Sequence, residues 1–140
     1  MSGSQPSSRE ERDAMSPQEQ LCSLIGRVLD SMEELIARGE DAPFPRYVCF
    51  PVPGKAQEAR LVLAREKRFT GKAPGDRTEN WRLSVGVVEA GGTRLHSHFL
   101  CHGEGPAGRE KVLACLHGPE FAERLASSVT ELSRSVDMDD

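Results

Sequence analysis

The chain has 140 residues, and its 18 lysines and arginines against 22 aspartates and glutamates give a net charge of −4. This length suits a single domain, because domains cluster near ~100–150 residues. With 29% charged and 37% hydrophobic residues, the composition is typical of a soluble globular chain. No apolar stretch approaches the ~20 residues that a membrane-spanning helix needs, and residues 1–16 lack the apolar centre of a secretory signal. We therefore expect a cytoplasmic protein that does not bind a membrane.

The N-terminal part of the chain predicts a tail followed by a long helix. Residues 1–15 contain little that could be buried, so we expect them to be disordered. Ser16 is the expected N-cap, with Pro17 at the first helical position and Glu19 completing a capping box. Apolar residues then recur three and four positions apart up to the expected C-terminal cap at Gly39. They are Leu21, Leu24, Ile25, Val28, Leu29, Met32, Leu35 and Ile36.

Four strand patterns follow this helix. Residues 47–50 are rich in β-forming residues, and residues 60–69 have an apolar centre. Residues 81–89 alternate between apolar and polar side chains, and residues 93–102 follow a turn with two glycines. The polar, glycine-containing residues 71–79 predict a long hairpin loop. Since each strand is joined to the next one by a turn or a hairpin loop, we expect an antiparallel meander.

Two helices are expected at the end of the chain. Residues 107–116 predict a short helix before Gly118, and a second helix follows with Pro119 near its first turn. The second helix has an apolar stripe made of Phe121, Leu125, Val129, Leu132 and Val136. Residues 137–140 should fray, because carboxylates at a helix C-terminus oppose the helix dipole. The expected fold is one two-layer α+β domain over residues 16–136, with a four-stranded antiparallel meander, one N-terminal helix and two C-terminal helices.

The turn between the last two strands decides which side chains the sheet buries, because a shift of one residue moves a whole strand's side chains across the sheet. A two-residue turn at Gly91-Gly92 would place the three histidines of the last strand on the apolar face. A three-residue loop over residues 90–92 would place Leu95 and Phe99 there instead. Burying these two side chains stabilises the fold by ~1.5–3 kcal/mol each, whereas burying unpaired imidazoles is unfavourable. We therefore predict the three-residue loop or a bulged equivalent.

The predicted register leaves one face of the sheet basic and open to a partner. The side chains that we expect to bind that partner are Arg82, Arg94, His96, His98 and His102. Residues 44–118 contain 12 basic and 7 acidic side chains, whereas residues 1–43 contain 4 and 9 and residues 119–140 contain 2 and 6. The sheet region is thus positive and lies between two negative segments.

His96 and His98 are the candidate metal ligands. Residues i and i+2 of a strand point the same way, so their imidazoles could hold one zinc ion at ~2.0–2.1 Å. His102 lies about 13 Å further along an extended strand with a rise of ~3.3 Å per residue. The remaining ligands would therefore have to come from Cys115, His117 or a second subunit. Because polar decoration of a solvent-facing strand is the simpler interpretation, we expect no cofactor.

The sequence offers no convincing catalytic group. The four cysteines form no CxxC pair, and they predict reduced thiols of a cytosolic protein. Cys101 and His102 are adjacent on a predicted strand and point to opposite faces, which prevents a thiolate–imidazolium pair. Neither a GxSxG elbow nor a phosphate-binding glycine loop is present. We therefore expect a protein without enzymatic activity.

Three functions stay open. The first is a homodimeric protein-binding adaptor or chaperone-like module, because the first helix has a broader apolar stripe than one small sheet requires. The second is nucleic-acid binding through Arg60, Arg82 and Arg94, against which stand the acidic chain and the expected burial of Trp81 and Phe99. The third is the metal site. The outline resembles that of small secretion chaperones and antiparallel-sheet adaptors, although no motif identifies a family, and we favour the first function.

Overall fold

The computed structural model describes residues 15–38, 43–69, 71, 77–105 and 107–138. The elements in chain order are helix α2 (Pro17–Ala37), strands β1 (Arg46–Pro51), β2 (Gln57–Phe69), β3 (Arg77–Glu89) and β4 (Leu95–Glu104), and helices α3 (Gly108–Leu116) and α4 (Phe121–Asp137). The four strands form one antiparallel sheet in the order β1-β2-β3-β4. The predicted α+β meander, with one N-terminal and two C-terminal helices, is confirmed. The predicted tail before Met15 and the predicted cap at Gly39 lie outside the described residues.

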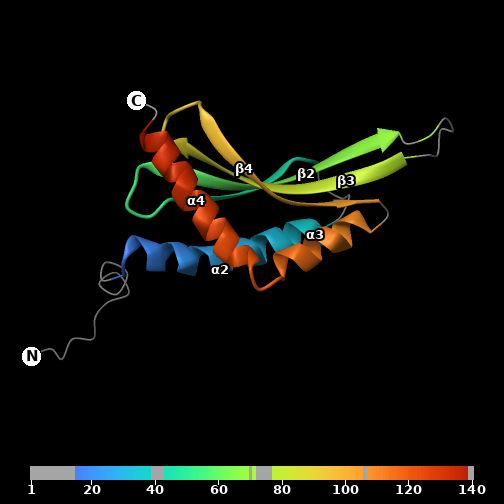
Figure 1. The fold of residues 1–140 in the computed structure, drawn as a ribbon, viewed down its shortest axis with the longest axis horizontal. Helices are drawn as coiled ribbons and strands as arrows, with labels where there is room; N and C mark the ends of the chain where they lie inside the picture. The colour runs from blue at the N-terminus through green and yellow to red at the C-terminus, as the bar shows by residue number, and fades with distance from the viewer. Residues whose placement is uncertain (1–14, 39–42, 70, 72–76, 106, 139–140) are drawn as a thin grey trace, which may run out of the picture.

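The helices form a layer on one side of the sheet (Figure 1). Helices α2 and α3 run along the lower side of the sheet in this view, and α4 crosses it obliquely. The core lies between the two layers and includes the alternate strand residues Leu61, Leu83 and Val85. Its helical half includes Leu21, Ile25, Val28, Met32 and Ile36 from α2, Val112 and Leu116 from α3, and the five predicted stripe residues of α4.

The apolar stripe of α2 packs into the protein's own core. Five of its eight residues are buried, and the other three, Leu24, Leu29 and Leu35, are half-buried. The stripe covers the sheet and contacts α4, so it leaves no large apolar surface for a second copy. This removes the reason for which the sequence predicted dimerisation through this helix.

Both ends of the helical layer are fixed by side chains. The Ser16 hydroxyl accepts a hydrogen bond from the Glu19 N–H at 3.1 Å, which confirms the predicted cap of α2. Asp137, predicted to fray, is instead the last residue of α4. Its carboxylate pairs with Lys55 and accepts a hydrogen bond from Gln57 Nε2 at 2.9 Å. The lysine charge compensates the carboxylate at the helix C-terminus, while residues 139–140 lie outside the described chain.

Strand β4 pairs with β3 in two registers that a bulge separates. Before the bulge, Leu95 lies opposite Val88 and His98 lies opposite Val85. This is the register of the two-residue glycine turn, so the predicted three-residue register is wrong. As a result, Leu95 and Phe99 point away from the helices, with 45% and 58% of their surface exposed.

Leu100 supplies the physical reason for this difference. It has no partner on β3 at the point where the register shifts, and it is only 3% exposed in the core. Beyond it, Cys101 lies opposite Leu83 and His102 lies opposite Arg82. Cys101 is thus on the core side and His102 on the other side, and these two faces are as predicted. A bulge adds one residue to a strand and reverses the faces that follow. The core thus takes Leu100 in place of the two apolar residues that the sequence argument had placed there.

Candidate functional site

The candidate site is the face of the sheet that points away from the helices, which we call the open face. The register places one residue from each strand in a row across it: Tyr47 on β1, Val62 on β2, Ser84 on β3 and Phe99 on β4. We call these four residues the central row. Tyr47 is 53% exposed and stands on one edge strand, while Phe99 stands on the other.

Leu95 extends the apolar part of the open face along β4. Its side chain lies over Gly86 of β3, where an added Cβ would approach the Leu95 Cδ1 to 2.7 Å. Val88, opposite Leu95 on the same face, is buried. Tyr47, Leu95 and Phe99 are the large, exposed hydrophobic side chains of the described sheet, and all three lie on this face. The open face is therefore more apolar than the sequence predicted.

Two arginines stand on opposite sides of the central row. Arg60 precedes the central-row residue of β2 by two positions, and Arg82 precedes that of β3 by two positions. Because β2 and β3 are antiparallel, these positions lie on opposite sides of the row. Arg60 Nε donates a hydrogen bond to Glu58 Oε1 at 2.7 Å, and Arg82 Nη2 donates one to Glu66 Oε1 at 2.8 Å.

Both guanidinium groups retain capacity for a partner. The side chains of Arg60 and Arg82 are 41% and 40% exposed. An arginine has five N–H donors in a planar arrangement, and the hydrogen bonds to Glu58 and Glu66 each use one of them. The glutamates hold the guanidinium groups at the surface, and further N–H groups face solvent.

The Arg60–Glu58 pair is connected to Cys49 of β1. The hydrogen bond from Arg60 lowers the pKa of the Glu58 carboxyl group, and the same bond raises the pKa of Arg60. Partial burial is the main cause that raises the pKa of the Cys49 thiol. The charge of Glu58 and a hydrogen bond to Glu58 raise this pKa further. This thiol therefore stays protonated at neutral pH, whereas a cysteine nucleophile needs the thiolate.

The predicted partner-binding residues separate into two groups. Arg82 and His102 share the open face, as the sequence predicted, and the structure places them opposite each other. Arg94 is exposed in the turn before β4. His96 and His98 lie on the helix-facing side, opposite buried valines of β3, so their predicted place on the open face is wrong. The cause is the register before the bulge.

One of these two histidines, His98, lies beside α4. His98 Nδ1 is 4.0 Å from Glu131 Oε2, and both side chains are accessible to solvent. His117, one of the possible further ligands, contacts α2 instead. Its Nε2 lies 3.1 Å from Oε1 of Glu33. Within the described part of the chain, no group of three His, Cys, Asp or Glu residues is arranged to hold a metal ion. Zinc binding by His96 and His98 stays a prediction.

The thiols of Cys101 on β4 and Cys115 on α3 interact beneath the sheet. Burial, together with a hydrogen bond to Cys115, raises the pKa of Cys101 to about 12. The Cys101 thiol is therefore protonated at neutral pH. It packs against the core as the small apolar group that the sequence predicted.

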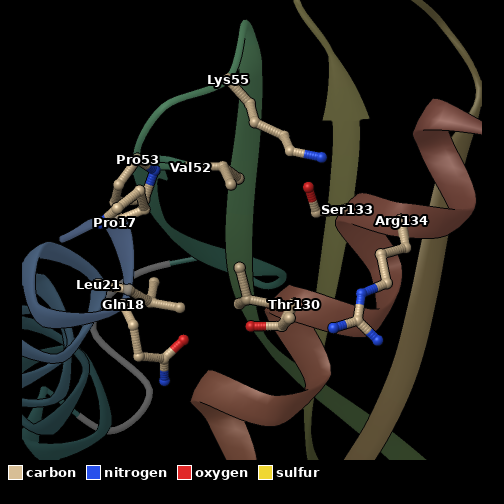
Figure 2. Close-up of a pocket in the computed structure, with 10 residues that line it drawn as sticks. Pro17, Gln18, Leu21, Val52, Pro53, Lys55, Thr130, Ser133 and Arg134 are labelled. Atoms are coloured by element: carbon tan, nitrogen blue, oxygen red, sulfur yellow. The ribbon is translucent and has the colours of Figure 1, made fainter.

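A cavity of about 200 Å³ lies between the start of α2, the turn after β1, and α4 (Figure 2). Pro17, Val52 and Ser133 line it, and Lys55 extends toward Ser133 across its upper part. Two of its polar groups are already paired, since Lys55 contacts Asp137 and the Ser133 hydroxyl donates to Gln57. Ligand pockets usually measure ~300–1,000 Å³. This cavity is a packing feature at the contact between the helices and the turn.

A wider depression of about 490 Å³ lies at the end of the sheet and continues the open face. It is lined by Cys49, Pro51 and Glu58 from the open face and by Ala90 and Gly91 from the turn before β4. The surface beside the apolar part of the open face is thus hollowed, which gives a partner additional contact area.

Comparison with protein-family models, with curated proteins and with solved structures finds no match for this chain. Among the described helices, none combines the length and the apolar character needed to cross a membrane. The function is therefore inferred from the geometry of the open face.

Proposed function

We propose that this protein is a non-enzymatic binding module of the adaptor or chaperone-like kind, and that its open face binds another protein. The observation that carries this proposal is the position of Tyr47, Leu95 and Phe99 on the one sheet face that no described helix covers. Clustered apolar side chains on a surface are typical of interaction sites. Aromatic residues contribute a large share of the binding energy at such sites.

Nucleic acid is the second candidate, because Tyr47 and Phe99 are exposed and single strands bind by stacking on aromatic rings. The charge of the open face favours a protein. Binding along a chain of phosphates requires excess positive charge, and Glu58 and Glu66 balance the charges of Arg60 and Arg82, so these two pairs give the open face no such excess. Arg46 and Arg65, also from the basic sheet region, instead lie over the Phe44 ring at 4.1 and 4.4 Å from its centroid.

Self-association through α2 is not part of the proposal, because the apolar stripe of α2 is already covered. We place the module in the cytosol, since its four cysteines are free thiols and such thiols persist in a reducing compartment.

The proposal is tested with a double substitution on the open face, Tyr47→Ser with Phe99→Ser. Both side chains are exposed, so we expect the variant to fold, as judged by circular dichroism. A matched control carries Ser23→Ala with Arg27→Ala, at exposed positions of α2. Partners captured from the native host are compared among the three proteins, and the affinity of each purified partner is then measured by calorimetry.

The wild type and the α2 control should bind the partner equally, and the open-face variant should bind it about 100-fold more weakly, as expected for loss of two aromatic hot spots. Equal binding by all three proteins would contradict the proposal. Capture of nucleic acid in place of a protein, with loss of that binding in the open-face variant, would contradict it as well.

A further inference from the structure

Resting on the proposed protein-binding function, we infer the chemistry of the partner. The open face fits a polypeptide segment of another protein in which large apolar side chains are flanked on both sides by carboxylates. The apolar side chains would contact Tyr47 and Phe99, and the carboxylates would bind Arg60 and Arg82.

The dimensions of the open face support one helix as the bound segment. Neighbouring strands lie ~4.7–4.9 Å apart, so the backbones of Tyr47 and Phe99 are about 14 Å apart across the four strands. Arg60 and Arg82 flank the row at a separation of about 13 Å along the strand direction, given ~3.3 Å per residue. A helix is ~10–12 Å wide with its side chains. A helix laid along the central row thus has one arginine beside each flank.

The arginines favour carboxylates on those flanks. A guanidinium binds a carboxylate through two parallel N–H groups, which gives both strength and geometric specificity. Arg60 and Arg82 are positioned by Glu58 and Glu66 through one hydrogen bond each. Such exposed ion pairs stabilise a free protein only weakly. A partner carboxylate can therefore share either guanidinium without a large cost to the fold.

The same charge pattern disfavours a second copy of this chain. Along the strands, the central row is followed on each side by an arginine, Arg60 or Arg82, and then by a glutamate, Glu58 or Glu66. In a face-to-face dimer centred on the central row, with its two-fold axis along or across the strands, each line of residues across the sheet meets either its own copy or the equivalent line on the other side of the centre. In both arrangements a line that contains an arginine would face another line that contains an arginine. The lines that contain Glu58 or Glu66 would likewise face each other or their own copies. Because opposed like charges suppress a complex, we assign the face to a different chain.

The test is a selection from a displayed random peptide library against the purified full chain, with counter-selection against the Tyr47→Ser, Phe99→Ser protein. We expect the enriched peptides to combine large apolar residues with aspartate or glutamate. Enriched peptides that are basic or uncharged would overturn this inference and leave the proposed protein-binding function intact. If no peptide that depends on Tyr47 and Phe99 is enriched, the proposed function fails together with the inference.

A second measurement uses an enriched acidic peptide and the variants Arg60→Gln and Arg82→Gln. Each substitution should weaken binding about 10-fold, as expected for loss of a charged hydrogen bond, and added salt should weaken the wild-type complex. Arg27→Gln, at an exposed position of α2, is the matched control and should leave the affinity unchanged. Unchanged affinity in both open-face variants would overturn the inference, as would displacement of the peptide by a single-stranded oligonucleotide.

Discussion

The imidazole of His102 lies 5.7 Å from the phenyl ring of Phe99, measured between ring centroids, although the two residues are three positions apart on β4. Side chains three residues apart on a regular strand point to opposite faces. The bulge at Leu100 adds one residue between them and brings both rings onto the open face. The same bulge therefore fills the core and completes the aromatic end of the open face.

This arrangement predicts that replacing two leucines of β4 by alanine changes the free energy of unfolding by unequal amounts. Leu100→Ala should lower the free energy of unfolding by about 2–5 kcal/mol, because Leu100 is buried in the core. Leu95→Ala should cost about 1 kcal/mol or less, since nearly half of the Leu95 side chain is exposed. Urea unfolding of the two variants measures both values. A larger loss for Leu95→Ala than for Leu100→Ala would mean that the observed register is incorrect.

The crossing of β4 and α3 predicts a severe effect at Gly103. A Cβ added at Gly103 would lie 2.3 Å from the Gly108 carbonyl oxygen, which belongs to the backbone and cannot rotate away. Gly103→Ala should therefore destabilise the fold by about 2 kcal/mol or more. Gly26→Ala is the matched control, because nothing lies within 4 Å of its added Cβ on α2. It should stabilise the protein by about 0.5–1 kcal/mol, and thermal unfolding of both variants checks the contrast.

The Cys101 thiol predicts how stability depends on alkaline pH. Its pKa is raised by burial to about 12, whereas an unfolded cysteine loses its proton near pH ~8.5. Between these values the unfolded state binds fewer protons than the folded state, so the free energy of unfolding falls as pH rises. The Cys101→Ala variant should show a shallower fall above pH ~8.5 than the wild type in urea titrations at increasing pH. Identical slopes for the two proteins would show that the thiol titrates normally.

Helices α2 and α4 could be predicted from sequence because their signals are local. The cap at Ser16 and the three- and four-residue spacing of apolar side chains depend only on neighbouring residues. The register of β4 could not be predicted from sequence. It depends on the bulge at Leu100, which no pattern in the neighbouring residues indicates. The energetic argument assumed that all large apolar side chains face the helices, and Phe99 shows that they do not.

The candidate site was predicted only in part for the same reason. Arg82 and His102 lie on the open face as expected, but Tyr47 and Phe99 were missed. The signal at Tyr47 was available, since it alternates along β1 with Val48 and Phe50, which pack toward the core. Sequence alternation shows which residues share a face, whereas the packing of the helices decides which face is left open.

The most direct test of the binding role is photo-crosslinking from the open face. A benzophenone amino acid is placed at position 99, and in a parallel protein at position 27 on α2, and each is irradiated with the bound partner. Crosslinks to a partner polypeptide should form from position 99 and not from position 27. Crosslinks from position 27, with none from position 99, would contradict the assignment of the open face as the binding surface.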